Sequence, residues 1–433
     1  MRSDARGDTS LVENDRAPAY RKVSHGPVED AANRTWVLVA GDFQRAGGMD
    51  RANAEFAAYL CATGASVHLV SHRVEDELAE HPKVQVHLAK RTGGVHFLAQ
   101  RHLDRLGRTV AAQVISRVPG ARVLVNGDNC DWPDINWVHY VHREWMTQPA
   151  AAPLWFRLKH GIDSRSHVRK ELRVLKAARV MIANSERTRA DLIRDVGVAP
   201  ERVRTVYLGC GSEWQTTTSD RRAAARAWLG ESLERPLAAF VGGFGHDSRK
   251  GFDTLWAAWK SLCAQPEWDA DLIVAGGGRA LPQWREEIER SGLGSRVRML
   301  GFTDRVPDVL AAADVLVSPV RYESYGLNVQ EAICCGVPAI VSRNAGVAER
   351  YPAELDELLL PDPEDTEDLL KRMLHWRSQI DEFKRCTVPL AATLRGWTWR
   401  DMAAQMVAVA ENTERSSGVA DSSDRNTVDG ASG

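Results

Sequence analysis

Short apolar runs alternate with longer amphipathic segments along most of the chain. Within the apolar runs, polar residues do not occupy every second position. This is typical of strands buried on both faces of a parallel sheet. The segments between them have the length of helices, and 50–62, which ends before Gly64, is a clear example. The pattern predicts an α/β protein with two groups of strands. The first group is Trp36–Ala40, Ser66–Ser71, Val84–Leu88, Val123–Val125, Trp137–Val141 and Val180–Ala183, and the second is Leu237–Val241, Leu272–Ala275, Val297–Met299, Val315–Ser318, Ala339–Ser342 and Glu357–Leu360.

The two groups of strands indicate two domains. Ser, Thr and charged residues cluster between Gly211 and Pro236, where we place the boundary. Open parallel sheets bind ligands at the carboxyl ends of their strands, so two such domains facing each other would enclose a binding cleft. The predicted organisation is a disordered polar tail over 1–33, a Rossmann-like domain over 34–214, a second Rossmann-like domain over 215–396, an amphipathic C-terminal helix over 397–413 and a disordered tail over 414–433.

Length and composition agree with this organisation. A chain of 433 residues, 44% hydrophobic and 26% charged, is sufficient for two globular cores. The segment 1–33 has no signal-peptide pattern, and no apolar run approaches the roughly 18 residues needed to cross a bilayer. Seven cysteines are scattered without metal-ligand or disulfide spacing. We therefore expect a cytoplasmic protein.

The net charge of −2 hides an asymmetry, since the first half of the chain is basic and the second half acidic. Residues 84–122 contain seven basic residues and one acidic residue, Asp104. Such a segment could face anionic lipid at the inner face of a membrane, or a phosphorylated acceptor, and a solvated helix face is the alternative. Nucleic-acid binding is not expected, because the aromatic interleaving that favours single strands is absent.

The candidate chemistry is concentrated in one loop and helix of the second half. Glu323 lies in a loop after the predicted strand 315–318, and Glu331 lies in the helix that follows Gly326. Helix N-termini present free N–H groups and partial positive charge, so the amides of Gly326, Leu327 and Asn328 could hold a diphosphate. The two carboxylates would then accept hydrogen bonds from sugar hydroxyls on either side of it.

This stretch resembles the donor site of the retaining glycosyltransferases of family 4, also called glycosyl transferases group 1, which have the two-domain GT-B fold. The downstream Gly336-Val337-Pro338 and the strand after it add to the resemblance. The resemblance implies that Glu323 lies near the hexose hydroxyls and that Glu331 binds the ribose of the nucleotide. It also implies that the C-terminal helix crosses back to the first domain.

A glycine-rich loop after the predicted strand 237–241 supplies the cations of this site. The loop ends in Arg249 and Lys250, which suit a diphosphate and resemble the family's phosphate-binding pair. Many members of the family have an arginine where this chain has Gly243, and we expect Arg249 to supply that charge. Two later loops, at Gly277 and Thr303, are where the resemblance places the nucleotide, although a triple glycine equally suits a plain turn.

The first half supplies the candidate acceptor residues. Gly47 and Gly48 directly precede a helix, so their backbone can approach an anion, and the resemblance places this loop over the donor phosphate and the acceptor. Asp50 and Asn53 would project from the helix start toward the acceptor, although Asp50 equally suits a helix N-terminus. The resemblance also places a histidine beside the donor sugar, for which His139 is the first choice and His142 the second, although a strand histidine is more often a core residue.

The resemblance implies transfer of a sugar from a nucleoside-diphosphate sugar to a hydroxyl of a carbohydrate, lipid-linked or small-molecule acceptor, in polysaccharide or glycolipid synthesis. No cofactor or metal is expected, because Asp269 and Asp271 only open a predicted strand. A non-catalytic nucleotide-sugar-binding scaffold and a GT-B epimerase remain alternatives. A dinucleotide oxidoreductase is disfavoured, because no Gly-x-Gly-x-x-Gly follows the first predicted strand.

Overall fold

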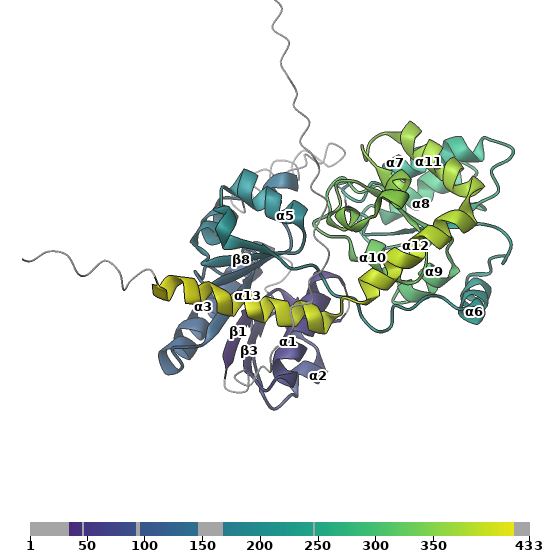
Figure 1. The fold of residues 1–433 in the computed structure, drawn as a ribbon. Coiled ribbons are helices and arrows are strands. Elements are labelled where there is room, and N and C mark those ends of the chain that lie inside the picture. The colour runs from purple at the N-terminus through teal and green to yellow at the C-terminus, as the bar shows by residue number, and fades with distance from the viewer. Residues whose placement is uncertain (1–33, 46, 92–95, 146–167, 246, 420–433) are drawn as a thin grey trace, which may run out of the picture.

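The computed structural model describes residues 34–45, 47–91, 96–145, 168–245 and 247–419. They form two α/β domains that lie side by side, each built on a twisted parallel sheet covered by helices (Figure 1). The α/β class and the two-domain architecture predicted from the sequence are therefore confirmed. The predicted tail 1–33 and the end of the second predicted tail, 420–433, lie outside the described residues.

The first domain holds a seven-stranded sheet in the order β5-β3-β1-β6-β7-β8-β9. Each neighbouring pair runs parallel. Its strands are β1 (Thr35–Val39), β3 (Ser66–Ser71), β5 (Val84–Leu88), β6 (Arg122–Asn126), β7 (Ile135–Val138), β8 (Val180–Ala183) and β9 (Val203–Thr205). The other elements are the small parallel pair β2 (Asp42–Phe43) and β4 (Arg73–Val74), helices α1 (Met49–Ala62), α2 (Asp76–Ala79), α3 (His96–Arg117) and α5 (Glu186–Asp191), the π-helix η3 (Leu192–Val196) and the 3₁₀ turns η2 (His142–Trp145) and η4 (Pro200–Arg202).

The second domain holds a six-stranded parallel sheet in the order β12-β11-β10-β13-β14-β15. Its strands are β10 (Leu237–Val241), β11 (Asp271–Ala275), β12 (Val297–Gly301), β13 (Val315–Ser318), β14 (Ala339–Ser342) and β15 (Leu359–Leu360). Its helices are α6 (Ser219–Leu229), α7 (Phe252–Cys263), α8 (Leu281–Arg290), α9 (Val306–Ala312), α10 (Leu327–Cys334), α11 (Thr366–Ser378) and α12 (Ile380–Arg395), with 3₁₀ turns η5 (Gly346–Arg350) and η6 (Ala353–Leu358).

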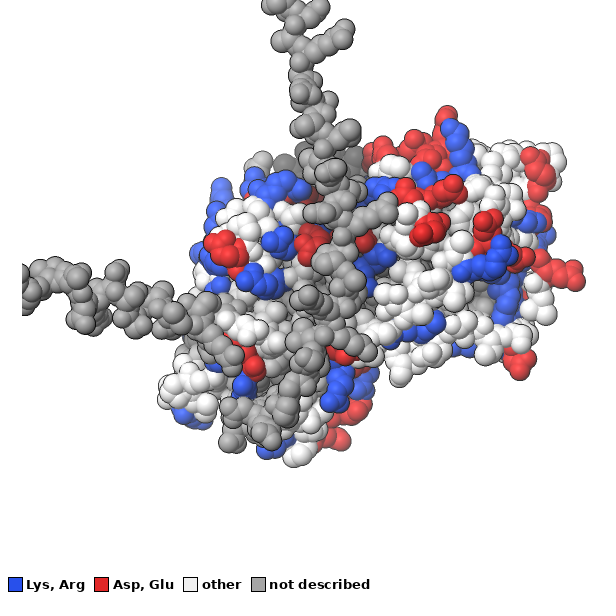
Figure 2. Space-filling view, viewed as in Figure 1, with Lys and Arg blue, Asp and Glu red and all other residues white. Residues whose placement is uncertain are grey.

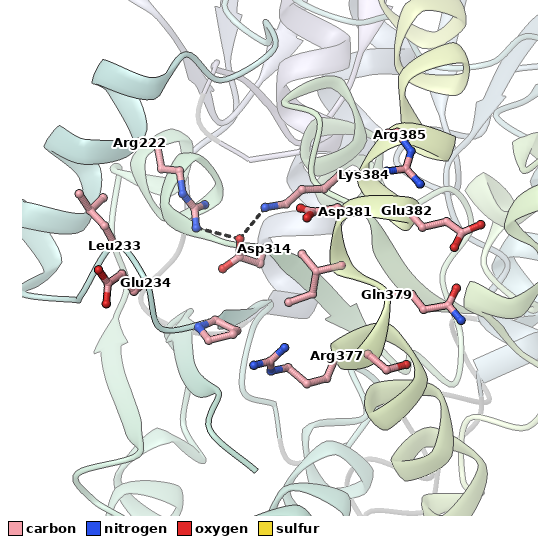
Figure 3. A pocket seen from close by; sticks show the side chains of 13 residues that line it. Arg222, Leu233, Glu234, Asp314, Arg377, Gln379, Asp381, Glu382, Lys384 and Arg385 are labelled. Atoms are coloured by element: carbon pink, nitrogen blue, oxygen red, sulfur yellow. Dashed lines mark hydrogen bonds and ion pairs between the residues drawn. The ribbon is translucent and has the colours of Figure 1, made fainter. Parts of the chain in front are cut away.

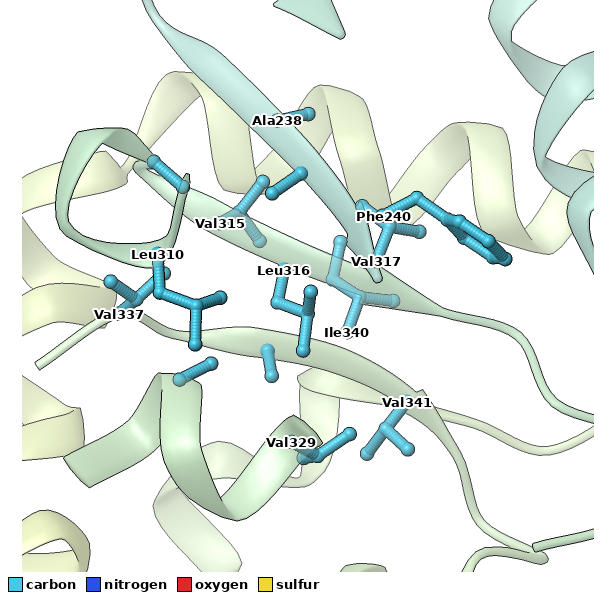
Figure 4. Packing of buried hydrophobic residues seen from close by; sticks show 14 of the residues in the cluster. Ala238, Phe240, Leu310, Val315, Leu316, Val317, Val329, Val337, Ile340 and Val341 are labelled. Atoms are coloured by element: carbon cyan, nitrogen blue, oxygen red, sulfur yellow. The ribbon is translucent and has the colours of Figure 1, made fainter. Parts of the chain in front are cut away.

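Buried strands explain why the apolar runs do not alternate with polar residues. On β1, Trp36 and Leu38 pack in the cluster that includes α1, while Val37 and Val39 pack against α3 on the opposite face. Both faces of the strand are covered, so every position favours an apolar side chain. In the second domain β10, β13 and β14 pack in the same way, with side chains from α9 and α10 filling the layer beside them (Figure 4).

The last helix, α13 (Trp399–Val419), returns from the second domain and lies across the first (Figure 1). Met402, Ala403 and Met406 are buried in the same cluster as Trp36 and α1. The predicted crossing helix is therefore confirmed, but it begins at Trp399 and extends into the segment that the sequence predicts to be a disordered tail. Within the described part of the chain, no helix is long and apolar enough to span a bilayer.

Two predicted strands differ from the structure, and one observed strand was not predicted. β7 ends at Val138, so His139 follows the strand and does not lie within it. β15 is only two residues long, because η6 occupies the residues before it. β9 was missed by the apolar pattern, because its middle residue Arg204 is exposed at the edge of the sheet.

The basic first half and acidic second half of the sequence do not form separate charged patches on the face of the molecule drawn in Figure 2. Figure 2 shows acidic and basic side chains interspersed over both domains. Many arginines are paired, as in the contacts of Arg73 and Arg91 with Asp42 at 2.9 and 2.7 Å. Local pairing therefore neutralises individual arginines, although the net basic excess of the first half remains.

Candidate donor site at the switch point of the second sheet

The strand order of the second sheet places its ligand-binding edge between β10 and β13. β10 is flanked by β11 on one side and β13 on the other, and the chain winds outward from it in both directions. In open parallel sheets this switch point opens a crevice at the carboxyl ends of the strands. The loop after β10 carries Arg249 and Lys250, and the loop after β13 carries Glu323. The candidate residues therefore come from the two loops that flank the crevice.

Close packing of loop backbones explains the glycines around this edge. A Cβ at Gly251 would lie 1.8 Å from the carbonyl oxygen of Pro319, so the loops after β10 and β13 touch through backbone. A Cβ added to Gly276 would likewise lie 1.8 Å from the Gly242 oxygen, and one added to Gly278 would lie 2.2 Å from the Phe244 oxygen. These glycines hold three loops together, which is the turn-and-packing role that the sequence left open.

Glu323 lies among cations. The Lys250 ammonium donates a hydrogen bond to its carboxylate, and Arg249 lies 3.9 Å from the same oxygen. Burial alone would raise the pKa of Glu323, but the charges of Lys250 and Arg249 outweigh it and hold that pKa below its usual range. Glu323 is therefore ionised at neutral pH and ready to accept hydrogen bonds from hydroxyl groups.

The N-terminus of α10 lies beside this pair. Gly326 caps the helix with a φ of +111°, a left-handed conformation that favours glycine. The amides of Leu327 and Asn328 are in the first turn and have no preceding turn to bond. The Asn328 side chain donates to the carbonyl oxygen of Val241 at 2.9 Å, which fixes the helix start to the end of β10. This N-terminus therefore offers partial positive charge at the switch point.

The Gly47–Gly48 loop of the first domain reaches this helix start. A Cβ at Gly48 would lie 3.3 Å from the Leu327 side chain, so the two loops are in contact distance of each other. Gly47 has a φ of +98°, which again favours glycine. The structure thus brings the first-domain glycines together with the donor-site helix, as the sequence predicts for a loop lying over the phosphate.

Glu331 has a different environment from Glu323, although both belong to the same loop and helix. No hydrogen bond is recorded for its carboxyl group among the described residues, and the nearest charged groups are Arg51 and Glu213, which pair with each other. Burial raises the pKa of Glu331 to about 8, and the charge of Arg51 only partly opposes this. A partly exposed carboxyl group without a recorded hydrogen bond is suited to a ligand hydroxyl.

Three further predicted donor residues line neighbouring loop ends. A Cβ added to Gly243 would lie 3.8 Å from the Gly277 oxygen, its nearest neighbour, so there is room for a Cβ at this position. Gly277 packs against Phe302, whose side chain is 84% exposed. The hydroxyl of Thr303 accepts a hydrogen bond from the Arg305 amide at 3.0 Å, which shapes the turn after β12.

His139 is buried directly after β7 at the carboxyl edge of the first sheet. Its ring packs on Trp137 with a centroid distance of 4.3 Å, and its Nε2 atom has no hydrogen-bond partner among the described residues. Burial lowers the pKa of His139 to about 3, so the ring is neutral at physiological pH. A neutral imidazole with an unpaired nitrogen can bond a sugar hydroxyl without introducing charge.

His142 is held by the buried Glu171. Its Nδ1 atom lies 2.8 Å from the carboxylate, and its backbone amide donates to the same group at 3.0 Å. Burial would lower the pKa of His142, but the hydrogen bond and charge of Glu171 outweigh burial and raise it. The pair organises the start of η2. Sequence patterns could not reveal this pair, because Glu171 is distant in the chain.

The predicted acceptor residues Asp50 and Asn53 are placed differently from each other. Asn53 is buried and accepts a hydrogen bond from Asn126 at 2.9 Å, so its contacts are those of an interior residue that ties α1 to β6. Asp50 lies in the first turn of α1 near Asp42. Burial and the charge of Asp42 raise the pKa of Asp50 to about 6. Of the two, Asp50 is the more accessible to a ligand.

Contacts across the two domains include residues that sequence reasoning missed. The Tyr322 hydroxyl accepts a hydrogen bond from the Val141 amide at 3.1 Å. Ser185 donates to the Ser324 carbonyl at 2.6 Å, and Glu349 accepts from the Glu186 amide at 2.8 Å. The first two bonds join the carboxyl edge of the first sheet to the loop that carries Glu323, and the third joins the start of α5 to η5. Only three-dimensional proximity reveals them, since their partners lie more than 100 positions apart in sequence.

Acidic residues that could suggest a metal are already paired. Asp269 bonds Arg377 at 2.6 Å, and Asp271 bonds Arg296 at 2.7 Å. Among the described residues, one group of three carboxylates lies close enough to share an ion, and Arg194 contacts each of its members, Glu144, Asp191 and Asp195. None of these residues belongs to the donor site.

The fold and the site define a class: a two-domain GT-B protein with an uncovered helix start, two cations and two carboxyl groups at the switch point of the second domain. Comparison with known protein families supports this class. Residues 235–377 match the model described as glycosyl transferases group 1, and residues 46–213 match the model of glycosyltransferase family 4. Together these matches span more than half of the chain. The chain belongs to the family 4 glycosyltransferases.

Two curated relatives illustrate the range of similarity. A D-inositol 3-phosphate glycosyltransferase of Saccharomonospora viridis is 34% identical over 224 residues, which cover 49% of this chain and 51% of that protein. The chain thus spans about half the length of this relative. One from Xylanimonas cellulosilytica is 26% identical over 406 residues, covering 86% and 93%. Among solved structures, sucrose-phosphate synthase from Thermosynechococcus elongatus shares the fold with a TM-score of 0.69 and 19% identity over 89% of this chain and 100% of that chain.

Proposed function

We propose that the protein is a retaining glycosyltransferase that moves a hexosyl group from a nucleoside-diphosphate sugar to an acceptor hydroxyl. The observation that carries this proposal is the Lys250–Glu323 pair at the start of α10, with Glu331 on the same helix. The cations and helix amides suit the diphosphate of a nucleotide sugar. The two glutamates, which differ in electrostatic environment, suit its hexose and its ribose. Membership of the family and its named relatives supports the same activity.

In this proposal the phosphate charge is taken by Arg249, Lys250 and the amides of α10. Glu323 accepts hydrogen bonds from the hexose, and Glu331 accepts them from the ribose. His139, neutral and with Nε2 unpaired, bonds a sugar hydroxyl from the first domain. Charge developing on the leaving diphosphate is stabilised by groups already in place, which is the main source of rate enhancement in such sites.

The chemical step is a substitution at the anomeric carbon. The bond from that carbon to the leaving phosphate oxygen breaks, and a bond to the acceptor oxygen forms on the same face. The acceptor proton passes to the departing phosphate oxygen, so no residue of the chain is needed as a covalent nucleophile. The two cations supply the positive charge for the leaving group, and we propose that no metal ion is required.

Product analysis tests this proposal. The purified protein would be incubated with UDP-, GDP- and ADP-sugars and a panel of acceptor sugars, with and without EDTA, and the linkage formed would be assigned by NMR. We expect a product that keeps the donor's anomeric configuration and forms at the same rate with EDTA. An inverted product would reject the retaining mechanism, and donor binding without any product would favour the non-catalytic scaffold.

The acceptor class is a finer proposal. The exposed side chains of Arg101, Arg105 and Arg108 follow one another along α3 and suit an acceptor presented at an anionic membrane surface. Sedimentation with vesicles containing anionic lipid, at low and high salt, tests this. Binding that salt removes supports a membrane-presented acceptor, and no binding at low salt would favour an acceptor in solution.

A further inference from the structure

A cavity of about 530 Å³ opens on the second domain away from the donor site (Figure 3). It lies between α6 with the segment 233–236 on one side and the turn from α11 into α12 on the other. Its inner wall includes Asp314, which directly precedes β13 and accepts a hydrogen bond from the Leu237 amide, at the start of β10, at 2.9 Å. The cavity is therefore at the amino ends of the strands whose carboxyl ends form the donor site.

The inner wall carries more positive than negative charge. The buried carboxylate of Asp314 accepts hydrogen bonds from Arg222 at 2.8 Å, Arg226 at 2.7 Å and Lys384 at 2.7 Å. Burial would raise the pKa of Asp314, but the charges of Lys384 and Arg222 outweigh it and lower that pKa. Of these three cations, Arg222 and Lys384 line the cavity, whereas Arg226 is fully buried behind it. The inner wall therefore presents two cations beside one ionised carboxylate.

The inner wall of the cavity still has N–H groups that can donate hydrogen bonds to a ligand. An ammonium group has three N–H donors, and a single hydrogen bond of Lys384, to Asp314, is recorded among the described residues. The Lys384 side chain is 35% exposed, so its ammonium group can be reached from solvent. In Figure 3, Arg222 and Lys384 approach Asp314 from opposite sides of the cavity. An anion with several oxygens can use both cations without breaking their bonds to Asp314.

The outer rim has the opposite chemistry. Glu234, Asp381 and Glu382 line the cavity and are exposed, and they outnumber Arg385, the exposed cation that lines it with them. Negative charge is therefore in excess where a ligand would project outward. Carboxylates repel a second phosphate group but accept hydrogen bonds from hydroxyl groups. A ligand that fits both regions has one anionic group for the wall and hydroxyl groups for the rim.

We propose that this cavity binds a sugar monophosphate, with the phosphate on Lys384 and Arg222 and the sugar hydroxyls toward Glu234 and Asp381. The volume lies within the range of about 300–1,000 Å³ that small-molecule sites occupy. Nucleoside di- and triphosphates should bind more weakly, because their additional phosphates would face the excess of carboxylates at the rim. The site is distinct from the donor site and does not depend on the proposed transferase activity.

Isothermal titration calorimetry on the full chain tests the proposal with glucose 6-phosphate, glucose 1-phosphate, fructose 6-phosphate and mannose 6-phosphate, beside glucose and inorganic phosphate. We expect at least one sugar phosphate to bind more tightly than inorganic phosphate, and glucose not to bind. Lys384→Gln should weaken that binding at least tenfold, since a hydrogen bond to a charged group is lost. Lys371→Gln, an exposed lysine of α11 that does not line the cavity, should not.

Two further variants separate this site from the donor site and from loss of folding. Asp381→Ala changes only the exposed rim, and it should weaken sugar-phosphate binding while leaving inorganic phosphate unaffected. Lys250→Gln should leave sugar-phosphate binding unchanged even if it abolishes nucleotide binding. The proposal is overturned if none of the four sugar phosphates binds, or if Lys250→Gln removes the binding and Lys384→Gln does not.

Discussion

At the scale of single residues, two glutamates of one loop and helix differ in protonation state at neutral pH. Glu323 is kept ionised by Lys250 and Arg249, whereas burial without a cation in contact raises the pKa of Glu331 to about 8. The difference comes from neighbours, since the side chains are identical. In the proposed function each state has a use, because Glu323 accepts hydrogen bonds from the hexose and Glu331 accepts them from the ribose.

The raised pKa of Glu331 predicts a pH dependence of stability. Between its ordinary pKa and about 8 the folded state binds a proton that the unfolded state has lost, so the stability contributed by this group falls as pH rises through that window. We expect Glu331→Gln to reduce the loss of stability between pH 6 and pH 9. Urea denaturation of both proteins at these two pH values measures this. An identical loss of stability in both would contradict the assigned environment.

Lys250 is predicted to act mainly on the chemical step. Replacing it by Met removes the charge nearest to Glu323 and one cation from the proposed phosphate site, so we expect kcat to fall by about 10² to 10³. The variant should also raise the pKa of Glu323 and shift the acidic limb of the pH–rate profile upward. Lys371→Met, at an exposed position on α11, is the control. A change confined to KM would contradict this role.

The sequence predicted the residues of this site whose spacing is local. Glu323, Gly326 and Glu331 lie in one strand-loop-helix unit, and Lys250 ends a glycine-rich loop, so chain order alone places them at one sheet edge. The contact of Tyr322 with the Val141 amide and the support of His142 by Glu171 depend on how distant segments meet. No pattern along the chain encodes such contacts.

At the scale of elements, the donor edge is built from loops in backbone contact. Gly251 has a φ of +72° and begins α7, and its missing Cβ is what allows Pro319 to approach. This contact fixes the loop that ends in Lys250 against the loop that leads to Glu323. The alignment of cations with the start of α10 therefore depends on a glycine that touches no ligand.

Gly251→Ala is therefore expected to destabilise the protein by about 2 kcal/mol or more, since it adds both left-handed strain and a clash. Nucleotide affinity should fall as well. Gly120→Ala is the matched control, because nothing lies within 4 Å of its added Cβ and its φ is not positive. Its stability should change by less than about 1 kcal/mol. Equal effects of the two substitutions would show that the loop contact is unimportant.

The elements themselves were largely predictable, because buried strands need apolar residues on both faces. The apolar pattern found β1, β3, β10 and β13, which lie inside their sheets. It failed at the edge strand β9 and at the end of β7, where the run Trp137–Val141 continues into a buried turn. Burial continues past the last ladder hydrogen bond there, so hydrophobicity alone could not locate the strand end.

At the scale of the whole molecule, α13 joins the two domains by packing on the first. Met402 and Met406 are fully buried against the core that contains α1. Gln330 on α10 also donates to the carbonyl oxygen of Gly209, in the segment between the domains, at 2.9 Å. The donor helix is therefore tied to the connection that would move if the domains closed over a substrate.

Met406→Ala is predicted to lower stability by about 2–5 kcal/mol, because it leaves a cavity under α13 in the first domain. Arg400→Ala, at an exposed position of the same helix, should change it by less than about 0.5 kcal/mol. Thermal unfolding of both variants and the parent provides the comparison. If Met406→Ala unfolds like the parent, α13 does not stabilise the first domain as the packing implies.

The most direct test of the donor site is thermal stabilisation of the protein by UDP, GDP, ADP and their common sugar conjugates. Glu331→Ala is the test variant, and Glu354→Ala, an exposed glutamate of η6, is the control. A ligand at 100 times its Kd adds about 2.7 kcal/mol of stability. We predict a clear shift with one nucleotide series that persists in Glu354→Ala and is lost in Glu331→Ala. No shift with any nucleotide, or an equal shift in both variants, would contradict a nucleotide-sugar site at α10.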